Sequence, residues 1–502
     1  MIQNLLVLGA GSAGLLAAIS IKRKIPQLNV RVVRSPSLGV IGVGEATTPN
    51  FPRHLFDYLG IPRKRFYELA QPTWKLGIKF LWGSRGRFDY TFNLQLDSHW
   101  SDLPKPTGFY CDDDFNNASL PGALMHQEMA FPRQANGAPD VHPWHAFHIE
   151  NKKFVEILEI VAREHGVEFT DGKVNGTERG PKGIAAIHLE DGQRLEADFF
   201  VDASGFRSEL IGKALEEPYI SFNKSLFCDR AVTGGWERTD ELIQPYTTAE
   251  TMNSGWAWQI DHERIINRGY VYCSQAISDD DALEEFHRKN PKITDAPHIV
   301  KFRSGCLQRQ WVDNVVALGN SAGFVEPLES TGLMMLCSHT QTLIDFLIHT
   351  NLRPTDTIRQ LFNDLTLTGW KDVRDFLAIH YKFNGMLDTP FWRQAREDTD
   401  VSGVAELIKF YQENGPTGFC RYRLPNTQTD FGLEGFLVMF VGNQVPYQNR
   451  HTPTARELQI WNQHKAEFIQ QAKGGIRSEE ALAYVKHPGW TWNADAAAAA
   501  AV

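Results

Sequence analysis

The chain lacks the cysteine patterns that build disulfide frameworks or zinc sites. Its 502 residues include six cysteines, no two of which form a C-x-x-C pair, and none stands near a histidine at metal-ligand spacing. Disulfide-dependent secreted domains are rich in cysteine, and structural zinc sites need closely spaced cysteine and histidine ligands. We therefore expect reduced, buried thiols, a cytoplasmic protein and no metal site.

Basic runs and membrane-length apolar runs are also missing. Lys and Arg total 51 against 60 Asp and Glu, which gives a net charge of −9. The apolar N-terminal run LLVLGAGSAGLLAAISI lacks a basic leader and is interrupted by Gly9, Gly11 and Gly14, so it does not predict a signal peptide. We expect neither a nucleic-acid partner nor a membrane association.

The composition is that of an ordinary globular protein with a large core. Hydrophobic residues make up 42% of the chain and charged residues 22%, so disorder is not expected. Aromatic residues reach 11%, with thirteen tryptophans, and either a heavy core or a pocket for a flat ligand would account for them. No repeat recurs at a fixed period. The alanine-rich tail, residues 496–502, is of low complexity and is left out of the fold prediction.

The first residues carry a dinucleotide-binding pattern. NLLVLGAGSAGLLAAISIKRKIP predicts a strand, a glycine turn and a helix, and NVRVVRS predicts the next strand. This is the G-x-G-x-x-G layout at the start of a βαβ unit. Its glycines let the backbone approach a pyrophosphate, and the helix N-terminus faces the negative charge. The candidate contacts are Gly9, Gly11, Ser12, Ala13 and Gly14.

One position departs from this pattern. An acid is expected at the end of the second strand, about 20 residues after the last glycine, where it would hold the ribose hydroxyls. Arg34 stands there instead, followed by Ser35. Either another group holds the ribose or Arg34 meets a phosphate, and Arg34 is kept as a candidate cofactor contact.

Three later segments also end in small residues that suit a close approach of backbone to ligand. They are GVGEATTPN, the buried strand that closes in DASG, and the strand that closes in GNSAG. No second G-x-G-x-x-G appears, so a separate nicotinamide domain is not expected. The candidate cofactor contacts in these segments are Gly42, Glu45, Ala46, Thr47, Asp202, Gly205, Gly319 and Asn320.

Other segments are ambiguous when taken alone. Lys75 and Lys79 in PTWKLGIKFLWG would share a face of one strand, and two exposed lysines would explain them equally well. Trp256 and Trp258 in SGWAWQIDH would share a face of another strand, as core residues or as a rigid aromatic wall. EPLESTG carries two acids three positions apart, a spacing common in solvated loops.

Taken in order, these segments resemble the flavin-dependent halogenases of the tryptophan halogenase group. The resemblance runs from about residue 5 to about residue 395 and rests on GAGSAG, GVGEATTP, WKLGIKF, VDASGF, LFCDRAV, GWAWQI, ALGNSAGFVEPLESTG, VRDFLAIHYKF and DTPFW. It implies an α/β protein with an FAD-binding, Rossmann-type, monooxygenase-like fold over residues 1–385. A mostly helical region, residues 386–495, would cap the substrate.

The resemblance also implies a reaction. A separate flavin reductase would supply reduced FAD (FADH2), and hypohalous acid would form from O2 and bromide, chloride or iodide. Lys75 would hold the halogen, and Glu329 would accept the ring proton of an electron-rich aromatic substrate. General-base help of this kind typically contributes ~10²–10⁴ in rate. The halide would bind at Ser330, Thr331 and Gly332, and the first acid, Glu326, would be structural.

Further motifs bear on the substrate. GVGEAT resembles the strap that links the flavin site to the substrate site, and the presence of Glu329 favours an indole-type substrate. Trp256 and Trp258 match the motif W-x-W-x-I-P, which keeps substrate away from the flavin. Asp261 replaces its proline, so the following loop is expected to leave the strand at a different angle.

FDYTF gives Tyr90 and Phe92 as candidate residues that stack on the substrate. Enzymes for free tryptophan usually have a histidine where Tyr90 stands, which argues against a close copy of their amino-acid site.

Two other functions share the fold. A two-component flavin monooxygenase (a hydroxylase) or a flavin reductase acting on a prenyl chain would need neither Lys75 with Glu329 nor the tryptophan pair. A flavin-binding regulator without chemistry is a third alternative, to which Arg34 and Asp261 leave some room. The expected partners are a small aromatic substrate and a transiently bound flavin reductase, and a homodimer is one expected oligomeric state.

Overall fold

The computed structural model describes residues 1–36, 39, 44–97, 100–103, 105, 108–111, 114–294 and 297–492. The predicted contact Gly42 and the tail 496–502 lie outside these residues. All six cysteines are buried and none forms a disulfide within the described residues, which confirms the predicted buried thiols. Within the described residues, no helix combines the length and the apolar character needed to cross a membrane.

The N-terminal βαβ unit forms as predicted and belongs to a six-stranded sheet. Its order is β20–β21–β12–β1–β2–β8, parallel except for the antiparallel edge strand β20. Near-continuous apolar runs such as LLVL suit strands that are buried on both faces. The strands are β1 (Asn4–Leu8), β2 (Asn29–Arg34), β8 (Glu168–Asp171), β12 (Phe199–Asp202), β20 (Trp311–Val312) and β21 (Val315–Ala317).

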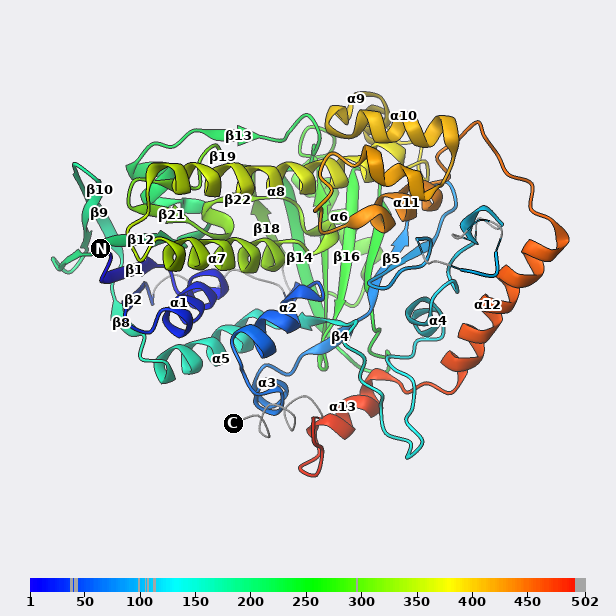
Figure 1. Cartoon of the computed structure of the whole chain (residues 1–502), viewed down its shortest axis with the longest axis horizontal. Helices are drawn as coiled ribbons and strands as arrows, with labels where there is room; N and C mark the ends of the chain where they lie inside the picture. Colours follow the sequence, from blue (N-terminus) through cyan, green and yellow to red (C-terminus); the bar gives the residue numbers. More distant parts are fainter. Residues whose placement is uncertain are drawn as a thin grey trace.

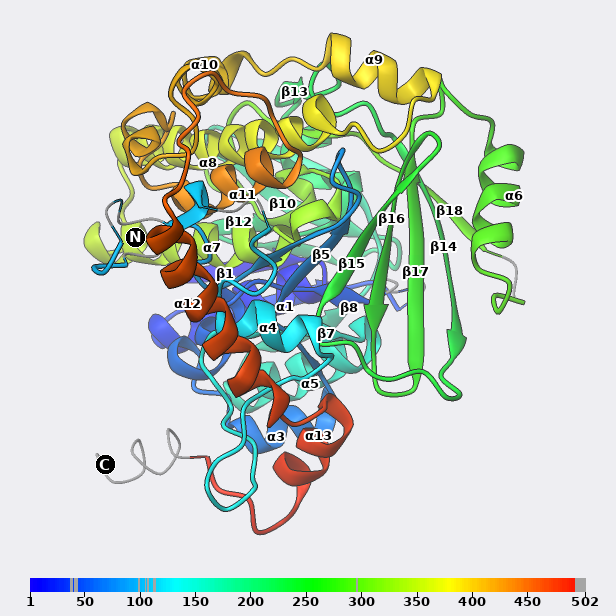
Figure 2. The ribbon, with the colours of Figure 1, turned by 90° about the vertical axis from the view of Figure 1, so that its right-hand side faces the viewer.

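A second, seven-stranded sheet carries the W-x-W segment. Its order is β18–β14–β17–β16–β15–β5–β6, and only β15 and β5 pair in parallel. Figure 2 shows its long strands beside one another, with α6 (Asp279–Lys289) on the outer face. The strands are β5 (Gly77–Leu81), β6 (Phe88–Thr91), β14 (Arg230–Glu237), β15 (Thr247–Met252), β16 (Gly255–Asp261), β17 (Ile265–Tyr272) and β18 (His298–Lys301).

Three small sheets complete the strand inventory of the described residues. A hairpin with Asp191 and Gly192 at its turn forms between β10 (Gly183–Leu189) and β11 (Arg194–Glu196), and β9 (Val174–Gly180) pairs with β10. The other two sheets are β3–β7–β4 and β13–β19–β22, with β3 (Glu45–Ala46), β4 (Thr73–Lys75), β7 (Ala146–Ile149), β13 (Tyr219–Ser221), β19 (Gly305–Leu307) and β22 (Gly323–Phe324).

The strand expected through WKLGIKF is broken. Lys75 ends β4 of the three-stranded sheet β3–β7–β4, and Leu76 lies between strands. Lys79 lies in β5 of the seven-stranded sheet. The prediction that the two lysines share one face of one strand is therefore wrong. The two environments differ, because the Lys75 side chain is buried whereas Lys79 is partly exposed over the ring of Tyr246.

Long helices cover the sheets. Near the six-stranded sheet, α1 (Ser12–Lys24) packs against α5 (Asn151–Glu164) and α7 (Gly332–His349). The longest helix, α8 (Asp356–Phe383), runs alongside α7 (Figure 1). Three helices in the first 330 residues are short: α2 (Asn50–Arg53), α3 (Arg63–Leu69) and α4 (Leu120–His126). Two segments are π-helical, η1 (His54–Tyr58) and η4 (Glu209–Ala214). The 3₁₀ turns of these residues are η2 (Gly108–Tyr110), η3 (Gly205–Arg207), η5 (Gly319–Ser321) and η6 (Pro327–Glu329).

The C-terminal region is helical, as predicted. Figure 1 shows α12 along the edge of the molecule, where it packs on α4. α13 contacts α3 and β4. The elements are α9 (Pro390–Asp398), η7 (Ser402–Val404), α10 (Ala405–Asn414), η8 (Gly418–Arg423), α11 (Gly432–Gly442), α12 (Ala455–Lys473) and α13 (Ser478–Lys486). The division at residue 385 stays a prediction.

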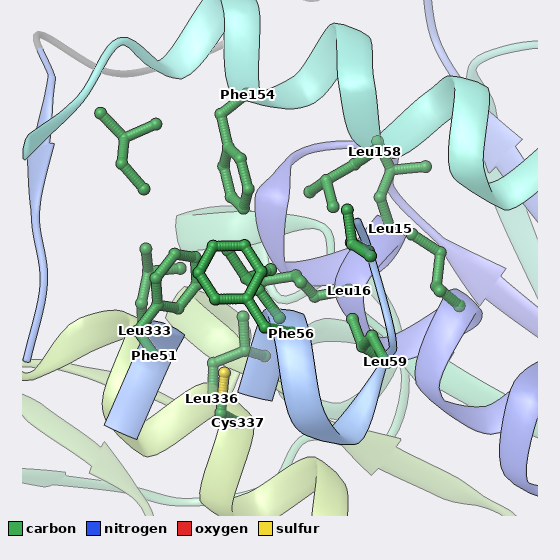
Figure 3. Close-up of a cluster of buried hydrophobic side chains, with 14 of the residues drawn as sticks. Leu15, Leu16, Phe51, Phe56, Leu59, Phe154, Leu158, Leu333, Leu336 and Cys337 are labelled. Atoms are coloured by element: carbon green, nitrogen blue, oxygen red, sulfur yellow. The ribbon is translucent and has the colours of Figure 1, made fainter. Parts of the chain in front are cut away.

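One apolar cluster fixes α1 and α7, the two helices whose N-termini line the cavity described in the next subsection. Its side chains come from α1, the α2–η1 segment, α5 and α7 and point toward one another (Figure 3). Full burial of a large apolar side chain contributes about 1.5–3 kcal/mol, so this cluster holds α1 and α7 firmly against each other. The labelled members are Leu15, Leu16, Phe51, Phe56, Leu59, Phe154, Leu158, Leu333, Leu336 and Cys337.

Candidate functional site

A cavity of about 1070 Å³ opens where β1, β2 and β12 end. In parallel α/β sheets, ligands bind outside the carboxyl ends of the strands, so this is the expected place for a dinucleotide. The cavity wall includes most of the predicted cofactor contacts: Gly9, Gly11, Ser12, Ala13, Arg34, Glu45, Ala46, Gly205, Gly319 and Asn320.

The glycine turn between β1 and α1 brings bare backbone to this cavity. Gly9 has φ +116°, and a Cβ there would lie 2.3 Å from the carbonyl oxygen of Ala203. Gly11 precedes α1, and no side chain caps the helix there. The first N–H groups of α1 are therefore available to an anion, and they fit the pyrophosphate of a dinucleotide.

Three predicted cofactor residues lie behind the wall. A Cβ on Gly14 would be 1.9 Å from the Gly9 carbonyl oxygen, so this glycine allows α1 to pack against the turn. Asp202 accepts hydrogen bonds from the backbone N–H groups of Ser204, Leu210 and Ile211, which shapes the turn at the end of β12. These two roles support the wall from outside the cavity.

Thr47, the third, joins the cavity wall to Lys75. Its neighbours Glu45 and Ala46 line the cavity, and its own carbonyl oxygen accepts a hydrogen bond from Lys75 Nζ at 3.1 Å. The Thr47 hydroxyl is anchored on β7, where it accepts the N–H of Phe147 at 2.8 Å. Residues 45–47 of the predicted strap therefore lead from the cavity wall to Lys75.

Lys75 is buried in a polar niche behind the cavity. Its Nζ also donates to Ser330 Oγ at 2.8 Å, and it lies 5.2 Å from the centre of the Phe92 ring. Burial lowers the pKa of Lys75 from 10.5 to about 7, although the nearby Glu329 carboxylate opposes this shift. A substantial share of uncharged amine is therefore present near neutral pH, and an uncharged amine can bond to an electrophilic halogen.

Glu329 is buried at the end of η6 and is bonded to α8. Its Oε1 lies 2.7 Å from His380 Nε2, while His380 Nδ1 lies 2.8 Å from the Phe376 carbonyl oxygen. A carbonyl oxygen only accepts, so Nδ1 carries a proton, and Nε2 and Oε1 must share one more. This pair can hold a proton and pass it on, and among the described residues no hydrogen bond to Oε2 is present.

Glu326 has a different environment three residues earlier. Its Oε2 accepts the indole N–H of Trp256 at 2.6 Å and the hydroxyl of Tyr381. Burial raises the pKa of Glu326 to about 7, against the effect of both donors. Its two donors belong to β16 and α8, so Glu326 joins these elements, in accordance with its expected structural role.

The predicted halide residues stand at the start of α7. Ser330 adopts φ +58°, Thr331 is the N-cap without a side-chain cap bond, and Gly332 begins the helix. All three line the cavity, and a Cβ on Gly332 would meet nothing within 4 Å. The free N–H groups of an 18-residue helix favour an anion at this place.

The predicted aromatic residues separate into two places. Trp258 lines the cavity, and its ring centre lies 6.1 Å from that of the buried Trp256 on the same face of β16. Tyr90 and Phe92 do not line the cavity. Phe92 lies by Lys75, and the partly buried Tyr90 ring lies 6.3 Å from that of Phe376.

Asp261 ends β16 in regular pairing with Ile266. Its carboxylate forms a buried ion pair with Arg238 at 2.9 Å. The expected change of loop angle stays a prediction.

Sequence reasoning missed the partners of the two acids on α8 and a carboxylate on α5. His380 and Tyr381 lie in VRDFLAIHYKF, a segment that supported the resemblance but received no role. Glu159 lines the cavity beside Arg34, and no local pattern indicates it, because 125 residues separate the pair.

The glycine turn, the uncapped start of α1 and the cavity at the strand ends define a dinucleotide-binding protein of the Rossmann type. Comparison with known proteins narrows this class. Residues 4–458 match the family described as tryptophan halogenase, and the chain belongs to that family. It is a flavin-dependent halogenase, an oxidoreductase with the FAD-binding fold of these enzymes.

Named relatives cover most of the chain. Tryptophan 7-halogenase KtzQ of Kutzneria sp. (strain 744) is 32% identical over 446 residues, 83% of this chain and 82% of that protein. Tryptophan 7-halogenase RebH of Lentzea aerocolonigenes is 31% identical over 441 residues, 82% of each.

Solved structures agree with these relatives. The structure of MibH, a lanthipeptide tryptophan 5-halogenase, has a TM-score of 0.87 at 37% identity and covers 97% of this chain and 94% of its own. That of BrvH, a flavin-dependent halogenase from Brevundimonas sp. BAL3, has a TM-score of 0.85 at 26% identity and covers 97% and 100%.

Proposed function

We propose that this enzyme halogenates an indole-type ring by electrophilic substitution, with Lys75 presenting the halogen and Glu329 accepting the ring proton. The observation that carries the proposal is the buried arrangement of Lys75, Ser330 and Glu329. Lys75 Nζ bonds Ser330 Oγ at 2.8 Å, Glu329 adjoins Ser330 in the chain, and its charge acts on the lysine. The relatives named as tryptophan halogenases support an indole ring.

The chain's own groups divide the work. The N–H groups at the start of α7 hold the halide beside Ser330, which is within hydrogen-bond distance of Lys75. Lys75 binds the electrophilic halogen and presents it to one ring carbon. Glu329 stabilises the cationic ring and takes the ring proton on Oε2. The hydrogen bond between Glu329 Oε1 and His380 Nε2 stabilises the carboxylate charge before this transfer.

The residues at the cavity fit FAD. The start of α1 would hold the pyrophosphate, and Trp258 and Ile260 give one side of the cavity an apolar face suited to a flavin ring. When bound in its reduced form, FAD would give two electrons to O2, and the halide would give two more; one oxygen atom then passes into hypohalous acid and the other into water. Thr47 and Ser330 lie between this cavity and the Lys75 amine, so hypohalous acid would reach the lysine past them.

The test is mass spectrometry of products. The protein is supplied with FAD, a generic flavin reductase, NADH, O2 and bromide, and then with chloride or iodide, while tryptophan, indole, a tryptophan-containing peptide and a phenol compete. We expect a bromine isotope doublet on an indole compound. Lys75→Ala and Glu329→Gln should abolish this brominated product. The control Lys79→Ala, which changes the partly exposed lysine of the seven-stranded sheet, should still form it.

Other outcomes would revise the proposal. Hydroxylated product without halogenated product would indicate a two-component flavin monooxygenase. Halogenated phenol in preference to indole would overturn the substrate class. The transient reductase and a homodimer are expected from the family, and a cytoplasmic location from cysteines that form no disulfide within the described residues. Light scattering and pull-down of a reductase would test the first two, and cell fractionation the third.

A further inference from the structure

The end of β2 carries the wrong charge for a ribose site, and the fold brings a carboxylate to the same place. Arg34 is the last residue of β2 and lines the cavity where an acid is expected to hold the ribose hydroxyls. Glu159 of α5 lines the cavity beside it. Both carboxylate oxygens of Glu159 lie 2.7 Å from Arg34 Nη1.

Arg34 is not available to a phosphate in this arrangement. Its Nε bonds Asp171 Oδ1 at 2.6 Å while its Nη1 bonds Glu159. These contacts raise the pKa of the Arg34 guanidinium and hold the pKa of Asp171 below its usual range. Two carboxylates therefore already neutralise the arginine, and a phosphate would have to displace one of them.

Glu159 retains capacity for another donor. Its Oε1 accepts from Arg34 and also from Arg163 Nη2, at 2.7 Å, one turn further along α5. Oε2 accepts only the Arg34 bond in the described contacts, at 2.7 Å. Because a carboxylate oxygen has two acceptor sites, Oε2 can take a hydroxyl donor without breaking either ion pair.

We propose that Glu159, held by Arg34, accepts the adenosine ribose hydroxyl of FAD in place of the missing acid on β2. The inference deepens the proposed function, because it rests on FAD as the cofactor. The arginine is then a positioning residue that draws a carboxylate from α5 to the end of β2. Of the two alternatives that the sequence left open, this is the one in which a group other than Arg34 holds the ribose, and that group is Glu159.

The chain offers a matched control. Asp171 also bonds Arg34, yet its side chain is 55% exposed and it is not part of the cavity wall. Glu159→Gln and Asp171→Asn each remove one charge from the same cluster with little change of shape. Only Glu159→Gln alters the group that we assign to the ribose, because the amide keeps one acceptor oxygen, which Arg34 engages, and replaces the other with an NH2 donor.

The experiment measures the Kd of the flavin-free protein for oxidised FAD by isothermal titration calorimetry. Two FAD analogues whose adenosine carries 2′-deoxyribose or 3′-deoxyribose are titrated in parallel. We expect Glu159→Gln to weaken FAD binding by about tenfold or more, as for loss of a hydrogen bond to a charged group, and Asp171→Asn to change it less than about threefold. One of the two deoxy analogues should bind the wild type more weakly than FAD binds the wild type. The same analogue and FAD should bind the Glu159→Gln variant with equal affinity.

Equal losses in both variants would overturn the assignment, because the ion-pair cluster would then act on the fold alone. A Glu159→Gln variant that still discriminates against both analogues as the wild type does would also overturn it. Melting temperatures identify a variant that fails to fold, and Glu159→Asp provides a second variant that keeps the charge and should recover part of the affinity. Failure of the wild type to bind FAD would refute both proposals, whereas FAD binding without halogenation would refute the proposed reaction alone.

Discussion

Replacing Lys75 with methionine should stabilise the protein at neutral pH although it removes the amine that we propose presents the halogen. The folded protein releases the lysine proton near pH 7, whereas the unfolded chain holds it up to an ordinary pKa of 10.5. The unfolded state therefore binds more protons between these values. The resulting penalty on the folded state is fully present below pH 7 and is lost as the pH rises to 10.5.

The structure gives the magnitude. A pKa difference of about 3.5 corresponds to about 5 kcal/mol at pH 7 and below. Methionine removes this penalty but leaves the Thr47 carbonyl and the Ser330 hydroxyl without their donor, at about 1 kcal/mol each. The Lys75→Met variant should thus exceed the wild type by about 3 kcal/mol near pH 6.5, and the two should become equal near about pH 9.

Urea unfolding of the flavin-free protein, followed by tryptophan fluorescence at several pH values from 6.5 to 9.5, tests this expectation. Lys182→Met, at an exposed position of the β9–β10 turn, is the control and should show no such pH dependence. The reasoning is refuted if the difference between Lys75→Met and the wild type is constant with pH. It is equally refuted if the wild type is the more stable protein at pH 6.5.

Two further substitutions separate support from contact. Gly14→Ala should lower the free energy of unfolding by about 1–3 kcal/mol and abolish FAD binding, because its Cβ would lie 1.9 Å from the Gly9 carbonyl oxygen. Gly11→Ala should leave thermal stability unchanged but weaken FAD binding, since its Cβ meets no protein atom within 4 Å and Gly11 lines the cavity; calorimetry and melting curves check both. His380→Phe should destabilise by about 3–5 kcal/mol by leaving Glu329 without its buried partner, and its halogenation rate should fall with unchanged Kd for FAD.

The parts of the fold that follow from local chemistry could be predicted from the sequence. The apolar run before Gly9 fixes β1, the glycines fix the turn, and the apolar spacing after Ser12 fixes α1, so the cofactor end of the site was foreseeable. The hairpin at Asp191 and the W-x-W strand follow in the same way from turn chemistry and alternation. Each of these features depends on residues that are close in sequence.

The rest depends on distant contacts that no local pattern encodes. WKLGIKF has the alternation of one strand, yet the chain moves from one sheet to another at Leu76 because β4 pairs with β7 and β5 pairs with β15. The Glu329–His380 pair spans 51 residues and the Arg34–Glu159 pair spans 125. Sequence marked one member of each pair as a candidate, and only tertiary structure supplies the other.

The two acids of EPLESTG acquire different chemistry from two consecutive residues of α8. Trp256 and Tyr381 donate to Glu326, and burial raises the pKa of Glu326 to about 7, so this acid fixes β16 against the helix. His380 can take or release a proton, and it binds the acid that lies near Lys75. Neighbouring residues of a helix point about 100° apart, so His380 and Tyr381 of α8 can contact Glu329 and Glu326 at the same time. Under the proposed function, the spacing of the acids thus places a structural carboxylate, Glu326, on Tyr381 and a proton-accepting carboxylate, Glu329, on His380.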